Sequence, residues 1–189
     1  MKRIILVLAA VLCSVGSYAQ LQWKADPNHS SINFDISHSG ISIVNGKFLD
    51  YTGSMTTTDE TLKDASFDFT IQANSINTSV EYRDNHLKSA DFFDVEKYPT
   101  ITFKSSKILA TGKPDQYLLY GDLTIKDVTK PVVFDVTYGG LVKSDKGDKM
   151  GLKAETTINR FDFNVDFDPT ATAVGKDVII VVHLQLAKQ

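Results

Sequence analysis

The segment YRDNHLKSADFFDVEKYPTITF, residues 82–103, holds the side chains of this chain best suited to acid–base chemistry. A histidine beside carboxylates can act as a general acid or base, so His86 with Asp84 or Asp91 would be the centre of a hydrolase or isomerase. Asp91 and Asp94 could also form a hydrolytic carboxylate pair, but carboxylates this close on a turn are more often capping or solvated residues. The segment therefore permits an enzyme without requiring one.

The sequence lacks the usual motifs of nucleophilic, phosphate-binding and metal-dependent enzymes. It contains no G-x-S-x-G, no P-loop and no dinucleotide-binding glycine pattern. The four histidines, His29, His38, His86 and His183, have no metal-ligand spacing. His29 and His38 are nine residues apart, which would place them on opposite faces of one regular strand. We therefore expect no metal, no cofactor and no catalytic residue.

The first nineteen residues are typical of a cleavable secretory signal peptide. A basic start is followed by an apolar run over residues 4–12 and by small residues up to Ala19. The apolar run is shorter than the ~20 residues that cross a membrane, and no later segment is longer. We expect cleavage after Ala19 and export of one domain, residues 20–189, without an integral membrane segment.

This cleavage would have two consequences for the mature chain. The only cysteine, Cys13, would be lost, so the mature protein would form no disulfide and offer no thiolate. Loss of Lys2 and Arg3 would leave 18 basic residues against 23 acidic ones, a net charge of −5. Nucleic-acid binding requires a basic face, so we expect no nucleic-acid partner.

Alternating apolar and polar residues predict β-strands through most of the chain. The two clearest strands place their apolar residues on one face: SINFDIS with Ile32, Phe34 and Ile36, and ASFDFTIQA with Phe67, Phe69 and Ile71. Further strands are expected over residues 101–108, 117–125, 132–138, 150–158 and 178–186. Turn signals such as SHSG, VNGK and YGG separate the strands. About eight one-sided antiparallel strands with short turns are typical of a barrel or a sandwich.

One segment, TSVEYRDNHLKSA, departs from the strand pattern. Thr78 is a candidate N-cap with Glu81 three residues later, which is a capping box, and Val80 and Leu87 have helical spacing. These features predict a helix of two or three turns. Pro99 then favours extended backbone before it and begins the next strand.

The apolar faces of these strands have two interpretations. An eight-stranded barrel is wide enough either to be filled by its own side chains or to hold one small ligand. Walls rich in Phe, Ile, Leu and Val would suit an apolar ligand, because a polar one needs convergent hydrogen-bonding groups. Periodicity alone favours a plain core, since apolar stripes usually pack against one another.

Several sequence blocks, in this order, resemble the YceI-like family of exported proteins: HSSINFDISHSGISIVNGKF, YRDNHLKSADFFDVEKYPTITF, GDLTIKDVTKPV, INRFDF and VGKDVIIVVHLQL. The resemblance covers about residues 23–186. Two positions differ from the family pattern, because Asp127 and Asn164 stand where glycine is usual. Asp and Asn tolerate the left-handed backbone that glycine provides, so these differences are compatible with the same turns.

The resemblance implies an all-β fold, an extended lipocalin-like antiparallel β-barrel of about eight strands with a short helical insertion near one mouth. It implies an apolar tunnel that binds, stores or carries a polyisoprenoid or similar long-chain lipid. It further implies a periplasmic protein without enzymatic activity and is compatible with a homodimer. Two alternatives stay open: a lipid-modifying enzyme based on His86 and an aspartate, and a structural or stress-associated module with a filled core.

Combining the resemblance with the strand pattern identifies candidate site residues. The expected tunnel wall consists of Phe34, Ile36, Phe67, Phe69, Ile71, Phe103, Leu119, Leu123, Phe134 and Val136. About half of these are expected to touch only protein, because a pocket takes a minority of an apolar wall.

The expected tunnel mouth consists of Leu87, Phe92 and Phe93 together with Arg83, Asp84 and His86. Arg83 would suit a phosphate head group. We favour instead a structural pair of Arg83 with Asp84, because an arginine beside an aspartate is already largely neutralised.

Overall fold

The computed structural model describes residues 20–189, and the predicted signal peptide lies outside the described residues. The chain forms the strands β1 (Leu21–Ala25), β2 (Ser31–His38), β3 (Ser42–Phe48), β4 (Tyr51–Thr57), β5 (Ser66–Gln72), β6 (Ile76–Asn77), β7 (Thr100–Ala110), β8 (Gln116–Ile125), β9 (Val128–Val142), β10 (Lys149–Asn159) and β11 (Val174–Lys188). Helical turns are α1 (Glu81–Lys88) and the 3-10 turns η1 (Ala73–Ser75) and η2 (Arg160–Phe163).

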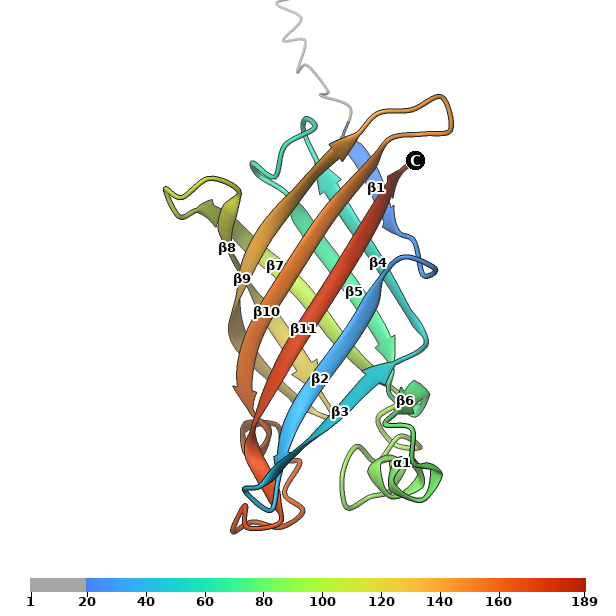
Figure 1. Ribbon diagram of the computed structural model, residues 1–189, viewed down its shortest axis with the longest axis vertical. Coiled ribbons are helices and arrows are strands. Elements are labelled where there is room, and N and C mark those ends of the chain that lie inside the picture. The colour runs from blue at the N-terminus through green and yellow to red at the C-terminus, as the bar shows by residue number, and fades with distance from the viewer. Residues whose placement is uncertain (1–19) are drawn as a thin grey trace, which may run out of the picture.

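Eight of these strands close into an antiparallel barrel (Figure 1). Their order is β1-β4-β5-β7-β8-β9-β10-β11, and β11 returns to pair with β1, with Trp23 opposite Lys188. The earlier part of β11 pairs with β2, from Ile36 opposite Val178 to Ser31 opposite His183. Strand β3 extends the sheet beyond β2 and pairs with the short β6. The predicted barrel of about eight strands is confirmed.

All of the predicted strands form, and β9 and β11 extend well beyond their predicted ranges. Strands β1, β3, β4 and β6 were not predicted. The sequence of β4, YTGSMTT, has a small or polar residue instead of a large apolar one at two inward positions, Gly53 and Thr57. The Asn-Gly of VNGK was interpreted as a turn, which is wrong, because Asn45 and Gly46 lie inside β3 opposite Asp35 and Phe34.

The predicted helix exists, but its predicted capping box is wrong. Helix α1 begins at Glu81, Val80 occupies the N-cap position, and no capping side chain bonds the first turn within the described residues. Instead, the carboxylate of Asp84 accepts hydrogen bonds from both the backbone N–H (2.8 Å) and the hydroxyl (2.5 Å) of Thr78. Val80, which was counted in the helical spacing with Leu87, lies before the helix and is 45% exposed. The helix is therefore anchored by a buried carboxylate on its own first turn.

The barrel is filled at the end where the chain's C-terminus lies. Trp23, Met55, Met150 and Leu186 are completely buried there. The indole N–H of Trp23 donates a hydrogen bond of 3.3 Å to the hydroxyl of Thr57. These large side chains leave little free space, so they seal this end.

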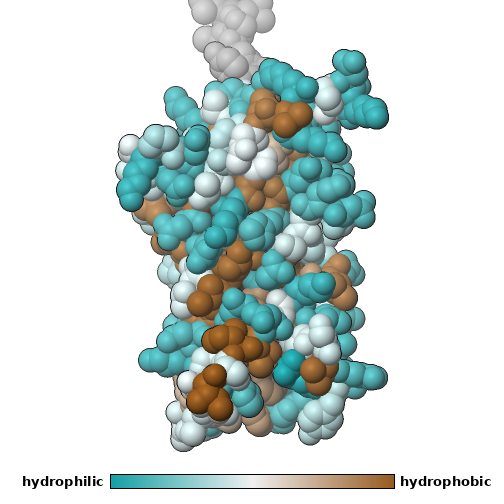
Figure 2. Space-filling view, viewed as in Figure 1, coloured by the Kyte–Doolittle hydropathy of each residue, from teal (hydrophilic) through white to brown (hydrophobic). Residues whose placement is uncertain are grey.

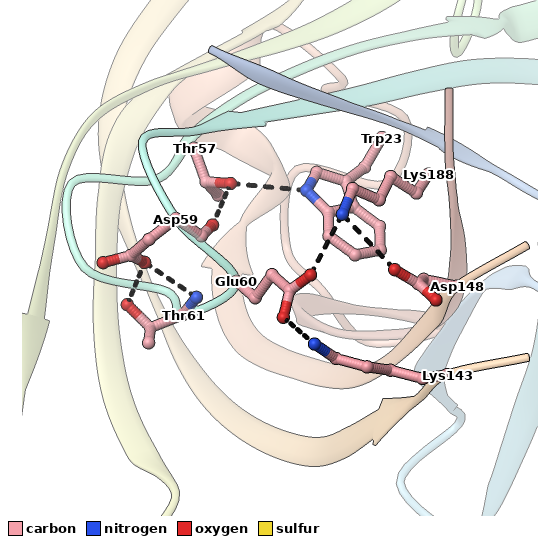
Figure 3. A network of polar contacts seen from close by, with 8 residues as sticks. All are labelled: Trp23, Thr57, Asp59, Glu60, Thr61, Lys143, Asp148 and Lys188. Atoms are coloured by element: carbon pink, nitrogen blue, oxygen red, sulfur yellow. Dashed lines mark hydrogen bonds and ion pairs between the residues drawn. The ribbon is translucent and has the colours of Figure 1, made fainter. Parts of the chain in front are cut away.

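Ion pairs cover the sealed end on its outer side (Figure 3). Glu60, in the loop between β4 and β5, contacts Lys143 (2.5 Å) and Lys188 (3.0 Å), and Asp148 contacts Lys188 (3.3 Å). Lys143 and Asp148 belong to the loop between β9 and β10, so two loops and the end of β11 are joined. Hydrogen bonds from Lys143 and Lys188 lower the pKa of Glu60, and hydrogen bonds to Glu60 and Asp148 raise the pKa of Lys188.

Candidate functional site

An apolar cavity of about 310 Å³ lies inside the barrel. This volume is within the range of pockets that bind small molecules. Nearly all of its lining side chains are apolar; within residues 20–189 the polar ones are Asn33, Ser37, His38, Arg83, His86 and Arg160. Such a wall offers a hydrocarbon ligand a favourable exchange for water and offers a polar ligand few partners.

All ten predicted wall residues lie on this cavity: Phe34, Ile36, Phe67, Phe69, Ile71, Phe103, Leu119, Leu123, Phe134 and Val136. Their inward orientation follows from the pairing register, in which Phe69 lies opposite Phe103 and Leu119 lies opposite Phe134. Whether each of them contacts a ligand stays a prediction.

Sequence reasoning missed the part of the wall that β10, β11 and the η2 region contribute: Leu152, Ala154, Ile158, Phe163, Val165, Phe167, Val174, Val178, Ile180, Val182 and Leu184. The β11 segment VIIVV has no alternation, so its inward face could not be assigned. The inward face of β11 is defined only by its pairing with β2, in which Ile180 lies opposite Phe34 and Val178 lies opposite Ile36.

The cavity approaches solvent at the end of the barrel near α1. Three rings meet there: His86 lies edge-on to Phe92 and to Phe167, each with centroids 5.0 Å apart, and Phe92 lies 4.7 Å from Phe167. Phe92 is buried, whereas Phe167 is 37% exposed. The Nε2 atom of His86 is 2.9 Å from Oδ2 of Asp91, which fixes the imidazole. We call His86, Phe92 and Phe167 the mouth cluster.

The predicted mouth residues divide into two groups. Leu87, Phe92, Phe93, Arg83 and His86 lie on the cavity wall. Asp84 does not, and its place in the mouth is corrected: it is 7% exposed, and its carboxylate, on the first turn of α1, binds Thr78.

Arg83 and Asp84 are not joined by an ion pair in the part of the chain that the structure describes. Both bind Thr78 instead, since Arg83 donates from Nε to the Thr78 hydroxyl (2.7 Å) and from Nη2 to its carbonyl oxygen (2.9 Å). Arg83 and Asp84 therefore have the structural role favoured for them, but they hold the helix by binding Thr78 and not by binding each other. These bonds fix the first turn of α1 to Thr78, which directly follows β6.

Arg160 is a wall residue that sequence reasoning did not single out, although it lies in the quoted block INRFDF. Its buried guanidinium donates hydrogen bonds to four carbonyl oxygens, those of Val165 (2.6 Å), Gly175 (2.8 Å), Val174 (2.9 Å) and Asp168 (3.1 Å). Burial lowers the pKa of Arg160, and the nearby Asp168 opposes that effect. Arg160 therefore holds the segment that carries Phe167 against the start of β11.

The two departures from the family pattern have different outcomes. Asn164 adopts the left-handed backbone, with φ of 56°, as expected where glycine is usual. Asp127 does not; in its turn the left-handed residue is Lys126, with φ of 55°. The adjustment at this turn is therefore one residue earlier than expected.

The described residues were also compared with the requirements of a metal site and of a membrane-spanning helix. Residues 20–189 contain no group of three His, Cys, Asp or Glu side chains placed to hold a metal ion. Among the helices of the same residues, none has the length and apolar character needed to cross a membrane.

Apolar side chains are also exposed near the mouth end. In Figure 2 apolar residues form a broken band down the viewed face, and part of this band lies at the lower end, where Figure 1 places α1 and the turn between β2 and β3. In that turn and the start of β3, Ile41 is 91% exposed and Ile43 is also exposed.

Comparison with known proteins gives consistent matches. The sequence profile of the YceI-like domain matches residues 23–186. Protein YceI of Escherichia coli O157:H7 is 35% identical over 181 residues, which cover 94% of each chain.

Solved structures share the fold. Burkholderia cenocepacia BcnA matches with a TM-score of 0.75 at 24% identity, covering 85% of this chain and 98% of that chain. A polyisoprenoid binding domain from Saccharophagus degradans matches with a TM-score of 0.69 at 16% identity, covering 89% of this chain and 99% of that chain.

Proposed function

Because the chain belongs to the YceI-like family, we propose that it binds, stores or carries a polyisoprenoid or similar long-chain lipid inside the barrel. The observation that carries this proposal is the cavity, which has an apolar wall, a sealed end at Trp23 and a mouth at the mouth cluster of His86, Phe92 and Phe167. The name of the Saccharophagus degradans domain supports the isoprenoid class. A cavity open at one end suits a ligand with one long apolar tail.

The volume of the cavity indicates how much of a chain it accommodates. At ~30 Å³ for each water-sized group, about 310 Å³ holds roughly ten chain carbons. At ~0.8 kcal/mol for each buried methylene, their transfer contributes roughly 8 kcal/mol, against an association cost of about 4–15 kcal/mol. Tight binding therefore needs further contacts, which the aromatic mouth cluster can supply to the rest of a longer chain.

Mass spectrometry of the purified protein tests the proposal. Protein isolated from cells should carry a long-chain lipid that native spectra show as added mass and that denaturing conditions release. Replacing Ala154, a wall residue, with Trp would place an indole in the cavity and should abolish the added mass. The matched control is Lys153→Trp, because Lys153 is the exposed neighbour on the outer face of β10. A wild-type protein that carries no lipid and takes up none when lipids are added would contradict the proposal.

A lipid-modifying enzyme is the second candidate, and the contact between His86 and Asp91 favours it. A hydrolytic dyad also needs a nucleophile. Within the described residues, the His86 ring forms no hydrogen bond with a Ser, Thr or Tyr hydroxyl; the hydroxyl of Ser89 donates to the His86 backbone carbonyl instead. Turnover of a lipid ester that His86→Ala abolishes, without loss of stability, would establish the enzyme. The same substitution altering only ligand retention would support a binding role.

We also propose, on the basis of the predicted signal peptide, that the protein acts in the periplasm. A homodimer is the second proposal, and it rests on the family resemblance. Cell fractionation with intact-mass measurement should find a periplasmic species that begins at Gln20. Protein that retains residues 1–19 would contradict cleavage, and sedimentation equilibrium would decide the oligomeric state.

A further inference from the structure

Three phenylalanine rings of the cavity wall lie directly over glycines of neighbouring strands. A Cβ atom on Gly46 would lie 2.1 Å from Cζ of Phe34, and one on Gly53 would lie 2.1 Å from Cε1 of Phe69. The third pair is Gly121 with Phe103, at 2.5 Å. Carbon atoms in contact are normally about 3.5–4.0 Å apart, so each ring occupies the space of the missing side chain.

The register explains this arrangement. Gly46 lies opposite Phe34 in the β2–β3 pair, and Gly53 lies opposite Phe69 in the β4–β5 pair. Residues directly opposite each other point to the same face of a sheet, here the inside of the barrel. Each ring can therefore lie along the wall over its glycine instead of projecting into the cavity.

Backbone conformation does not account for these glycines. Their φ angles lie outside the left-handed region, which Gly40, Gly112, Gly140 and Gly147 adopt among the glycines of residues 20–189. Glycine inside a strand weakens it by roughly 0.5–1 kcal/mol relative to alanine, so its presence there points to a need for space.

We propose that Gly46 and Gly53 are specificity-determining residues: each seats a phenylalanine ring against the wall and thereby sets the width of the cavity and the thickness and length of the chain it accepts. The ligand class in this inference rests on the lipid-binding function proposed above. The geometric part, that these glycines keep the cavity open, does not depend on the ligand.

The effect of alanine at these positions follows from the contacts. A methyl group on Gly53 would require the Phe69 ring to move by at least about 1.4 Å to reach an ordinary contact distance. The three nearest atoms to that methyl all belong to the Phe69 side chain, so the ring is the group that must move, and free space lies on the cavity side. At Gly121 the carbonyl oxygen of Lys104 would also be only 2.6 Å away, which would strain the sheet itself. Gly46 and Gly53 are therefore the informative positions.

The test compares Gly53→Ala and Gly46→Ala with a matched control, Gly151→Ala. Gly151 is also a strand glycine, but its methyl would lie 3.8 Å from Gly139, an ordinary contact, and it does not line the cavity. Delipidated protein is titrated with geraniol, farnesol and geranylgeraniol, and xenon occupancy of the cavity is measured in pressurised crystals or by xenon NMR.

We expect both glycine variants to bind geranylgeraniol roughly four- to fifteenfold more weakly than wild type, which corresponds to lost room for one or two chain carbons. Geraniol, whose ten carbons already fill the wild-type cavity, should lose about as much affinity as the longer alcohols, and xenon occupancy should fall. Gly151→Ala should match wild type in every measurement. The double variant Gly53→Ala with Phe69→Leu should recover xenon occupancy and geranylgeraniol binding, because the shorter side chain leaves the methyl room.

Unchanged xenon occupancy in stable Gly53→Ala and Gly46→Ala proteins would overturn the inference, as would a double variant that recovers stability without recovering the cavity. If Gly53→Ala does not fold, Gly46→Ala decides, because its methyl group would displace the Phe34 ring in the same way. A wild-type protein that binds xenon but none of the alcohols would contradict the proposed function while leaving the xenon comparison to decide the role of the glycines.

Discussion

Replacing Arg160 with methionine should destabilise the barrel without changing its topology. Methionine approximates the length of the side chain but removes its four hydrogen bonds to backbone carbonyls. A hydrogen bond from a charged donor contributes about 1.5–3 kcal/mol, and an unsatisfied buried carbonyl costs about 1–3 kcal/mol. The bond to Val165 is buried, whereas the other three are partly buried and their carbonyls can bind water. Since removing the buried charge also relieves a desolvation cost, we expect a net loss of about 3 kcal/mol.

Chemical denaturation is the appropriate assay, because the protein has a single tryptophan, Trp23, and it is completely buried in the sealed end. Its fluorescence reports unfolding of the whole barrel. The variant should lower the urea midpoint at an unchanged slope with denaturant, since the surface exposed on unfolding is nearly the same. Arg160→Lys keeps the charge but cannot reach four carbonyls, so its urea midpoint should lie between those of Arg160→Met and wild type. Amide exchange should increase around Phe167.

A free energy of unfolding for Arg160→Met within about 1 kcal/mol of wild type would refute the reasoning, because it would mean that water replaces the guanidinium at little cost. Amide exchange that rises throughout the barrel instead of around Phe167 would also be inconsistent with a local anchoring role.

Three further predictions concern the two ends of the barrel. Glu60→Gln should reduce the dependence of stability on pH. The lowered pKa of Glu60 contributes stability that is lost as the pH falls below the ordinary value of 4.5, and the raised pKa of Lys188 contributes stability that is lost as the pH rises above the ordinary value of 10.5. The urea midpoint of the variant should therefore differ from that of wild type mainly between these two pH values. Phe92→Ala should cost about 3 kcal/mol and speed ligand release, measured by stopped-flow displacement, and an unchanged release rate would exclude Phe92 as a gate. Asp84→Ala should cost about 2 kcal/mol, because Thr78 loses its buried acceptor, and amide exchange of α1 should rise before that of the barrel.

The sequence was sufficient to predict the strands whose apolar residues alternate and the wall residues that those strands carry. Phe67, Phe69 and Ile71 point inward because β5 has polar residues at every other position. The same rule fails for β4, where Gly53 is an inward position that a ring from β5 fills. An inward glycine is invisible to hydrophobic periodicity, since the side chain that occupies the position belongs to another strand.

The mouth shows a second limit of sequence reasoning. Thr78 and Glu81 match the capping-box pattern, but the carboxylate that binds Thr78 is that of Asp84, three residues further along. Local patterns name the residue types at a helix start and do not decide which of several nearby carboxylates is used. The role of Arg160 was equally out of reach, because its four carbonyl partners lie in a loop and a strand start whose positions only the closed barrel defines.

The seam between β1 and β11 has a consequence for how the protein folds. Trp23 pairs with Lys188 across nearly the whole length of the described chain, and β11 also pairs with β10 and β2. Contacts this distant in sequence form late, because the entropy of closing so large a loop is lost before they contribute stability. A chain whose β11 has not yet paired would leave edges of β1, β2 and β10 unpaired, a state prone to aggregation. Productive folding of this barrel therefore depends on preventing the free edges of β1, β2 and β10 from pairing with other chains until β11 has paired with them.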